Sequence, residues 1–356
     1  MPKKRIITAS QAINEATLMA MKKDKKVFVI GEGVNDPKEI FGTTKNLKKK
    51  FSSKRVIETP ISENAMTGLC IGSAMMGLKP IQIHQRVDFA LLALEQIMNN
   101  CAKAFYVSNS KHTVPLVIRM IIGRGWGQGP MHSQILDSLF ASIPGLKVIM
   151  PTFPNDFKGM MLSAIKDSNP VIILEHRWLH NIKGDVPTKY YFKNIDNIRK
   201  IKNGNDLTIV ANGYNLLEVI EIQKILNKEG ITFDLFDLNV IQPLETKSII
   251  NSVKKTGRII VIDSGFKNFG IGSEIISRIS EDCMDKLKSK PVRIGLPFIP
   301  TPSSRFLANS YYPNKKTILL SILDMLGKGK NKEELLKKVE PNIPVDVPDL
   351  NFKGPF

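Results

Sequence analysis

Short apolar runs alternate with amphipathic stretches along most of the chain. In the first half the apolar runs lie at residues 26–30, 80–84, 115–119, 147–150 and 170–174. Apolar residues at helical spacing separate them, as in Ala12, Ile13 and Ala16, a helix that Thr8 or Ser10 can cap. Runs that are apolar throughout are typical of strands buried on both faces of a parallel sheet. The pattern therefore predicts an α/β fold with a doubly wound, mainly parallel sheet.

The same alternation resumes after a polar stretch. Residues 188–203 are mostly polar, and further strands are expected at 207–211, 232–236 and 258–262. Lysine and proline are frequent from residue 328 onward. We therefore expect a first domain at 1–187, a linker at 188–203, a second doubly wound domain at 204–327 and a C-terminal arm at 328–356.

Composition agrees with a soluble globular protein. The chain has 356 residues, of which 42% are hydrophobic and 24% charged, so it has room for two cores. No apolar run reaches the roughly 18 residues of a membrane span, and the basic start is not followed by a signal-type apolar stretch. Three cysteines form neither a disulfide framework nor a metal-type spacing. We expect a cytoplasmic protein with no membrane partner.

The net charge of +18 raises the question of a nucleic-acid partner. The excess consists of lysines spread along the chain, including runs at 45–50 and 328–338, and these runs are typical of solvated surfaces. Aromatic residues do not alternate with them. We therefore expect no nucleic-acid binding and consider an acidic partner subunit the better explanation of the charge.

Glu63 has the most informative position among the charged residues. It follows the turn residues Thr59 and Pro60 and begins a helix rich in small residues, such as Gly68 and Gly72. A carboxylate between the end of a strand and the start of a helix is a common place for chemistry in α/β proteins. An acidic residue there is also favoured simply by the helix dipole. Spacing alone leaves both interpretations open.

Several sequence blocks in a fixed order resemble one family. They are residues 31–32, 58–63, 88–89 with 95–99, 127–134, 144–148, 167–170, 237–239 and 252–258. Together they are similar to the β subunit of thiamine-diphosphate-dependent 2-oxo acid dehydrogenases, which includes pyruvate, branched-chain and acetoin dehydrogenase β chains. This family is the pyrimidine-binding half of the transketolase superfamily. The resemblance implies a pyrimidine-binding domain followed by a transketolase C-terminal domain.

The resemblance also assigns roles to individual residues. It implies that Glu63 hydrogen-bonds the aminopyrimidine ring of thiamine diphosphate, that Phe89 stacks on that ring, and that Glu32 and Gln85 lie beside it. His132 ends a glycine-rich loop, which suits a residue that approaches the substrate as proton donor or carboxylate ligand. Glu63 and His132 are thus the expected catalytic residues.

Two further expectations concern ions. Asp167 and Asn169 resemble positions around which the family often holds a potassium ion, although a helix-ending turn explains them equally well. His176 and His180 have the i, i+4 spacing of a metal pair, but no third ligand follows, so we expect no zinc site.

One motif of the superfamily is missing from the sequence. A Gly-Asp-Gly followed some 25 residues later by Asn, which holds the diphosphate through Mg²⁺ in that superfamily, is absent. The resemblance therefore implies an α subunit that carries the Mg²⁺ site, an α2β2 assembly, and transfer of the acyl group to a lipoyl-bearing acyltransferase.

The sequence also departs from the family. Residues 84–87 replace an aromatic-rich stretch, and the extra cation Arg86 favours a substrate with a carboxylate or phosphate. Asp263 and Ser264 replace a His-Glu or Glu-Glu pair. The expected reaction is decarboxylation of a 2-oxo acid or cleavage of an acyloin. The alternatives are a two-chain transketolase-like enzyme acting on sugar phosphates and a non-catalytic β-type scaffold.

Overall fold

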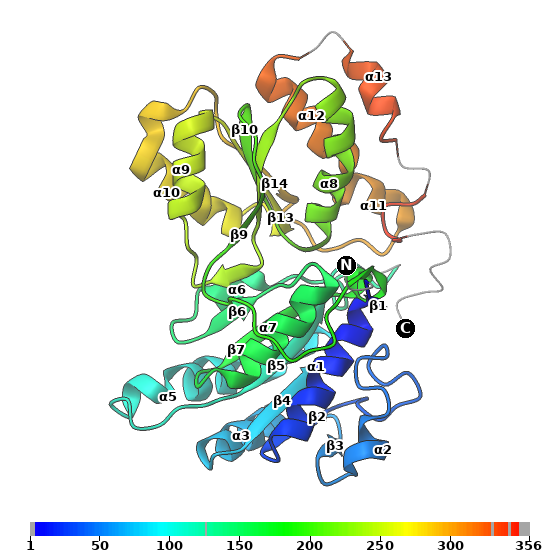
Figure 1. The fold of residues 1–356 in the computed structure, drawn as a ribbon, viewed down its shortest axis with the longest axis vertical. Helices are drawn as coiled ribbons and strands as arrows, with labels where there is room; N and C mark the ends of the chain where they lie inside the picture. Colours follow the sequence, from blue (N-terminus) through cyan, green and yellow to red (C-terminus); the bar gives the residue numbers. More distant parts are fainter. Residues whose placement is uncertain (1–3, 125–126, 329–330, 341–342, 349–356) are drawn as a thin grey trace.

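The computed structural model describes residues 4–124, 127–328, 331–340 and 343–348. Two α/β domains lie one above the other along the long axis, and the second half of the chain forms the upper one in Figure 1. Each domain is built on its own sheet. This is the two-domain α/β architecture that the sequence pattern predicts.

The lower domain contains a seven-stranded sheet in the order β12-β6-β7-β5-β4-β2-β3. Its strands are β2 (Val27–Gly31), β3 (Val56–Glu58), β4 (Lys79–His84), β5 (Val117–Ile122), β6 (Lys147–Ile149), β7 (Val171–His176) and β12 (Val240–Gln242). All neighbours are parallel except β12 and β6. The five apolar runs of the first half are therefore strands of one largely parallel sheet, as expected.

Helices cover both faces of this sheet. They are α1 (Ala9–Lys23), α2 (Leu47–Phe51), α3 (Glu63–Met75), α4 (Val87–Ala90), η1 (Leu91–Ala93), η2 (Gln96–Cys101), α5 (Ala102–Val107), α6 (Asp137–Ala141), α7 (Pro154–Lys166) and η3 (Arg177–Asn181). Alternate residues of β2 show the two buried faces: Phe28 packs in the core that includes α3, and Val29 packs in the core that includes α1 and α7. Strands β1 (Ile6–Thr8) and β8 (Lys183–Asp185) form a small antiparallel ribbon.

Two local predictions can be compared with the elements. Thr8 caps α1 through a capping box with Gln11, as the pattern suggested. Leu91, Leu94, Ile97 and Met98 have helical spacing and predict one long helix, but the structure divides this region into α4, η1, η2 and α5, of which η2 is a π-helix. A change of helical pitch is not encoded by apolar spacing, which looks similar for all three helix types over so few residues.

The upper domain has a five-stranded sheet in the order β14-β13-β10-β11-β9. Its strands are β9 (Arg199–Lys202), β10 (Leu207–Ala211), β11 (Phe233–Asp237), β13 (Ile259–Phe266) and β14 (Val292–Leu296). Its helices are α8 (Gly213–Lys228), α9 (Lys247–Thr256), α10 (Ile271–Cys283), η4 (Met284–Lys286), α11 (Arg305–Tyr311), α12 (Lys315–Leu326) and α13 (Lys332–Lys337). Only β9 runs antiparallel to its neighbour.

Segments expected to be irregular contain regular structure. Strand β9 lies within the predicted linker and pairs with β11. Helix α13 lies within the predicted arm, and its Leu335 packs in the core of the second domain. The basic residues of β9 and the lysines of α13 hide these elements from a hydrophobic pattern, because no residue of β9 is fully buried and α13 buries only Leu335. The domain limits at 187, 204 and 327 stay a prediction.

Candidate active site

The expected site residues gather at the carboxyl ends of β3, β2 and β4. Glu32 follows β2, Gln85 and Arg86 follow β4, and Glu63 begins α3 after β3. These three strands are adjacent and parallel, so their carboxyl ends meet at one edge of the sheet. In open α/β sheets this edge is where ligands bind.

Glu63 is buried, with 5% of its surface exposed. Its backbone carbonyl accepts a hydrogen bond from Thr67 Oγ1 at 2.7 Å. Among the described residues, no donor hydrogen-bonds its carboxylate. A buried carboxylate without a donor is costly, and a ligand that offers an N–H would offset this cost.

Glu32 lies close enough to Glu63 for the two charges to interact. Its Oε1 accepts a hydrogen bond from the Ser62 backbone N–H at 3.3 Å, which fixes the turn that leads into α3. Burial, and then the neighbouring charge of Glu63, raise the pKa of Glu32 above its ordinary value. Two carboxyl groups therefore lie close together at this edge of the sheet.

The loop after β2 is held in place by two neighbours. The backbone N–H groups of Gly33 and Asn35 donate to the Glu58 carboxylate at 2.5 and 2.8 Å. Gln85 Nε2 donates to the Glu32 carbonyl at 3.2 Å. Gly33 has a φ of +72°, and a Cβ there would lie 2.0 Å from Gln85 Nε2. Only glycine fits this close approach.

Phe89 and His132 form the second part of the site. Their rings meet edge to face with centroids 5.4 Å apart. Asp88 Oδ1 accepts hydrogen bonds from the Gln134 backbone N–H at 3.3 Å and from Gln134 Nε2 at 2.9 Å, which ties the end of the His132 loop to α4. Helix α3 packs against η1 and η2, which follow the Phe89 helix α4 directly along the chain.

Arg86 lies beneath the same loop. Its Nη2 donates a short hydrogen bond to Gln128 Oε1, and its Nη1 is buried without a partner among the described residues. Burial lowers the pKa of Arg86 to about 10, partly opposed by Asp88. The structure thus brings all the residues expected around cofactor and substrate to one edge of the sheet.

Asp167 and Asn169 lie elsewhere, after α7. Asp167 Oδ1 accepts the Asn169 backbone N–H at 2.9 Å, and its Oδ2 accepts Lys147 Nζ at 2.7 Å. These contacts form a turn closed by an ion pair. Within the described ranges no group of three or more His, Cys, Asp or Glu side chains is arranged to hold a metal ion. The potassium ion stays a prediction.

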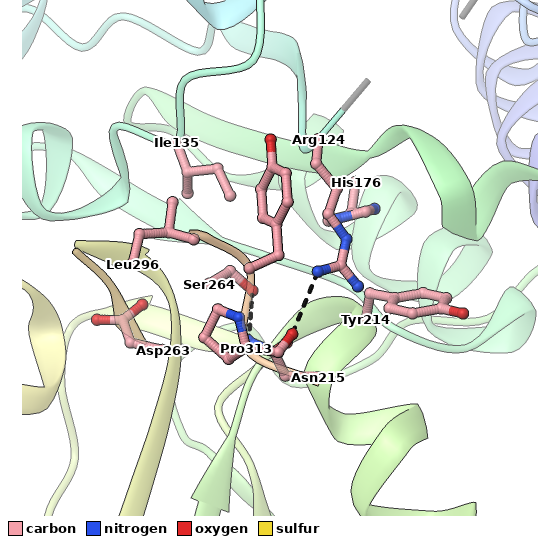
Figure 2. Close-up of a pocket in the computed structure, with 10 residues that line it drawn as sticks. Arg124, Ile135, His176, Tyr214, Asn215, Asp263, Ser264, Leu296 and Pro313 are labelled. Atoms are coloured by element: carbon pink, nitrogen blue, oxygen red, sulfur yellow. Dashed lines mark hydrogen bonds between the residues drawn. The ribbon is translucent and has the colours of Figure 1, made fainter. Parts of the chain in front are cut away.

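A cluster that the sequence did not reveal fills the boundary between the domains. Figure 2 shows Arg124 reaching toward Pro313, whose carbonyl accepts from Arg124 Nη1 at 3.2 Å. The Arg124 guanidinium also lies 4.5 Å from the Trp178 ring and 4.9 Å from the Tyr312 ring. A cavity of about 20 Å³, room for about one water, remains beside these residues.

A buried acid pair lies at the same boundary. Asp137 begins α6, and Asp263 lies on β13. Asp263 accepts hydrogen bonds from the backbone N–H groups of Gly265 at 3.0 Å and Gly272 at 3.3 Å. Burial, and then Asp263, raise the pKa of Asp137 well above its ordinary value. The departure at Asp263 and Ser264 was the sequence signal for this pair, and it gave no indication of the partner.

His176 and His180 do not face a common ligand. His180 Nε2 lies 3.1 Å from Glu175 Oε2, and Glu175 also pairs with the fully buried Arg119 at 2.5 Å. The His176 ring stacks on Tyr214 at 5.7 Å. Both histidines therefore make separate structural contacts.

Within the described ranges no helix combines the length and apolar character needed to cross a bilayer.

Comparison with known proteins extends over nearly the whole chain. Residues 5–182 match the transketolase pyrimidine-binding domain, and residues 196–318 match the transketolase C-terminal domain. The pyruvate dehydrogenase E1 component subunit beta of Porphyra purpurea is 37% identical and aligns over 90% of this chain and 96% of its own length. The beta subunit of acetoin:2,6-dichlorophenolindophenol oxidoreductase from Bacillus subtilis is 35% identical over 91% of this chain and 98% of its own length.

A solved structure shares the same fold. A split-gene transketolase, described as an inactive β4 tetramer, superposes with a TM-score of 0.72 at 19% identity and covers 90% of this chain and 98% of its own. The matched domains and the relatives agree. This chain therefore belongs to the β-subunit family of thiamine-diphosphate-dependent 2-oxo acid dehydrogenases, with a transketolase-type pyrimidine-binding domain and C-terminal domain.

Proposed function

We propose that this chain is the β subunit of an α2β2 enzyme that decarboxylates a 2-oxo acid, or cleaves an acyloin, and passes the acyl group to a lipoyl-bearing acyltransferase. The observation that carries the proposal is the buried Glu63 carboxylate, to which no described residue donates a hydrogen bond. The relatives named for pyruvate and acetoin substrates support this reaction class. A cytoplasmic location stays a prediction.

The residues present fit the pyrimidine end of thiamine diphosphate. Glu63 offers a carboxylate to a ring nitrogen, Glu32 and Gln85 lie beside it, and Phe89 offers a half-buried ring for stacking. When bound, thiamine diphosphate supplies the nucleophilic carbon and the electron sink for the reaction. Glu63 orients the ring and holds charge next to it, while the His132 ring, against Phe89, is placed to move a proton to or from the substrate.

A separate α subunit would hold the diphosphate through Mg²⁺. Exposed apolar side chains on and around α3, η1 and α5 of the first domain support such a partner: Ile61, Leu69, Met75, Met76, Leu92, Phe105, Tyr106 and Val107 are all more than a third exposed. Exposed apolar residues in this number on one domain are typical of a subunit interface. We infer that the active site is completed there.

Replacement of Glu63 tests the proposal. The chain is co-expressed with a chain that carries the diphosphate motif, and turnover of pyruvate and acetoin is measured with dichlorophenolindophenol as electron acceptor. In Glu63→Gln we expect kcat to fall ~10²–10³-fold, because a charged hydrogen bond worth about 2–4 kcal/mol in the transition state is lost. Thermal unfolding should be unchanged.

The matched control is Glu95→Gln, the same replacement at an exposed residue of the same domain. It should retain full turnover. Near-normal turnover in Glu63→Gln would contradict the assigned role. Turnover of ketose phosphates with no turnover of 2-oxo acids would instead support the transketolase-like alternative, which the buried cation Arg86 favours.

A further inference from the structure

Charge is divided along the edge of the sheet that carries the site. Carboxylates lie at the ends of β3 and β2, where Glu58, Glu32 and Glu63 are found. Buried arginines lie at the ends of β4 and β7, at Arg86 and Arg177. The acidic end suits the aminopyrimidine ring of the proposed cofactor. The basic end has no assigned ligand.

Arg86 is 4% exposed and lacks a full set of partners. Gln128 accepts from Nη2, but Nη1 is buried without an acceptor. Asp88 interacts with it electrostatically; Asp88 Oδ1 accepts from Gln134, and Asp88 Oδ2 is buried without a hydrogen-bond donor among the described residues. No carboxylate of the described residues lies within ion-pair distance of Arg86. A buried guanidinium with an unused N–H donor can bind an external anion.

Arg177 is a second cation of the same kind. It is 8% exposed, its guanidinium lies 4.1 Å above the Phe41 ring, and its Nε is buried without an acceptor. It also has no carboxylate within ion-pair distance in the described part of the chain. Burial, and then repulsion from Arg86, lower the pKa of Arg177 to about 10. The two guanidinium groups are therefore near enough to interact, and one bound anion would offset both charges.

The Phe41 ring under Arg177 borders an open space, which neither Arg177 nor Arg86 itself lines. Three successive non-glycine residues, Glu39, Ile40 and Phe41, have φ values of +46°, +47° and +57° and hold the ring under Arg177. Phe41 also lines a cavity of about 290 Å³ together with Asp36, Pro37, Lys38, Ile40 and Gln85. This volume is near the lower end of the range for small-ligand pockets. Gln85, in turn, contacts Glu32 of the proposed cofactor site.

We infer that Arg86 and Arg177 recognise a second anionic group on the substrate, a distal carboxylate or phosphate separate from the carboxylate next to the keto carbon. The inference rests on the proposed function and specifies its substrate class. Two planar guanidinium forks match the oxygens of either anion. When that anion is not bound, the neutral Gln128 side chain accepts the hydrogen bond from Arg86.

Kinetics in the co-expressed complex test the inference. We compare kcat/KM for 2-oxoglutarate, 2-oxo-4-phosphonobutanoate and 2-oxohexanoate, which has a similar length but no distal charge. Wild type should favour one of the charged substrates at least tenfold over 2-oxohexanoate. Arg86→Met and Arg177→Met should each bring kcat/KM for the preferred charged substrate down to that for 2-oxohexanoate. Lys111→Met, which removes an exposed charge, is the matched control and should change nothing.

Binding to the full chain provides a readout that does not depend on turnover. Calorimetry should show that either glutarate or methylphosphonate binds the wild-type chain. Binding of glutarate would identify the distal group as a carboxylate, and binding of methylphosphonate would identify it as a phosphate. Affinity should fall at least tenfold in Arg86→Met and less in Arg86→Lys, which keeps the charge without the fork. The lysine variant also keeps the test valid if the methionine variant does not fold.

The outcomes separate the two proposals. If 2-oxohexanoate is turned over, the arginine variants keep the wild-type preference and neither anion binds, then the inference is wrong and the proposed function stands. If an anion binds through Arg86 but no 2-oxo acid is turned over by the loaded complex, the proposed function is wrong and the anion site stands.

Discussion

At the scale of single residues, Glu63 depends on a buried chain of polar groups behind it. Thr67 Oγ1 donates to the Glu63 carbonyl and accepts from Gln82 Nε2 at 2.6 Å. Gln82 Nε2 also lies 3.0 Å from His84 Nε2, which must accept. Burial lowers the pKa of His84 to about 4, so the ring is neutral at pH 7, as this hydrogen bond requires.

Removal of the Thr67 hydroxyl should destabilise the first domain. In Thr67→Val the side chain keeps its shape, but one Gln82 N–H becomes buried without an acceptor, which costs about 1–3 kcal/mol. We expect the urea midpoint of unfolding to shift accordingly. Thr67→Ser keeps the hydroxyl and should be much closer to wild type. Equal midpoints for valine and wild type would show that the chain of hydrogen bonds contributes little.

At the scale of elements, α3 has one face that packs into the core and another that is apolar but exposed. One face packs into the core through Met66, Cys70 and Ala74. The opposite face carries Ala65, Leu69 and Gly72, all exposed, at a spacing that forms one stripe along the helix. A free-standing helix of a soluble domain normally has polar residues there. This stripe continues into the exposed Met76, so the element is built to be covered.

A charge on this stripe should interfere with assembly but not with folding. For Leu69→Lys, at a side chain 53% exposed, we expect sedimentation to show loss of association with the co-expressed partner and an unfolding midpoint within error of wild type. Asn227→Lys adds the same charge to an exposed position of α8 and should assemble normally. Normal assembly of Leu69→Lys would place the subunit contact on another surface.

At the scale of the whole molecule, the two domains share one interior. The core that packs under α3 continues into Phe236, Leu238 and Ile241 of the second half of the chain. Strand β12 from that half extends the first sheet beside β6. The Asp137 and Asp263 pair lies at this boundary. Asp137 follows His132 by five residues in the sequence. The position of the His132 loop therefore depends on how the domains meet.

The acid pair should make stability depend on pH. The unfolded chain releases the Asp137 proton near its ordinary pKa of 3.8, whereas the folded chain retains it to higher pH. The stabilisation is therefore complete below that pH and declines by about 1.4 kcal/mol per pH unit as pH rises through the interval up to the folded pKa. Asp137→Asn mimics the protonated form and removes this decline.

Chemical unfolding of both proteins from pH 4 to pH 8 measures the effect. The difference in unfolding free energy, Asp137→Asn minus wild type, should increase with pH and be positive at pH 8. Titrating groups that do not interact with Asp137 cancel in this difference because they are common to both proteins; Asp263, which does interact with it, is part of the measured effect. A difference that does not vary with pH would mean that Asp137 ionises normally in the fold.

The sequence by itself determined the architecture and the identity of the expected site residues. Apolar runs predict strands buried on both faces, because a strand with one face in solvent would have polar residues at alternate positions. The order of the motifs indicates the family. Charged or lysine-rich elements such as β9 and α13 escaped this reasoning, since few of their residues are buried. The tertiary structure alone decided that Arg177 lies near enough to Arg86 to be repelled by its charge and that Asp137 hydrogen-bonds Asp263. The residues of the first pair are 91 positions apart in the sequence, and those of the second are 126 positions apart. Local periodicity predicts neither the burial of such residues nor their pairing, because it reports only on neighbours along the chain.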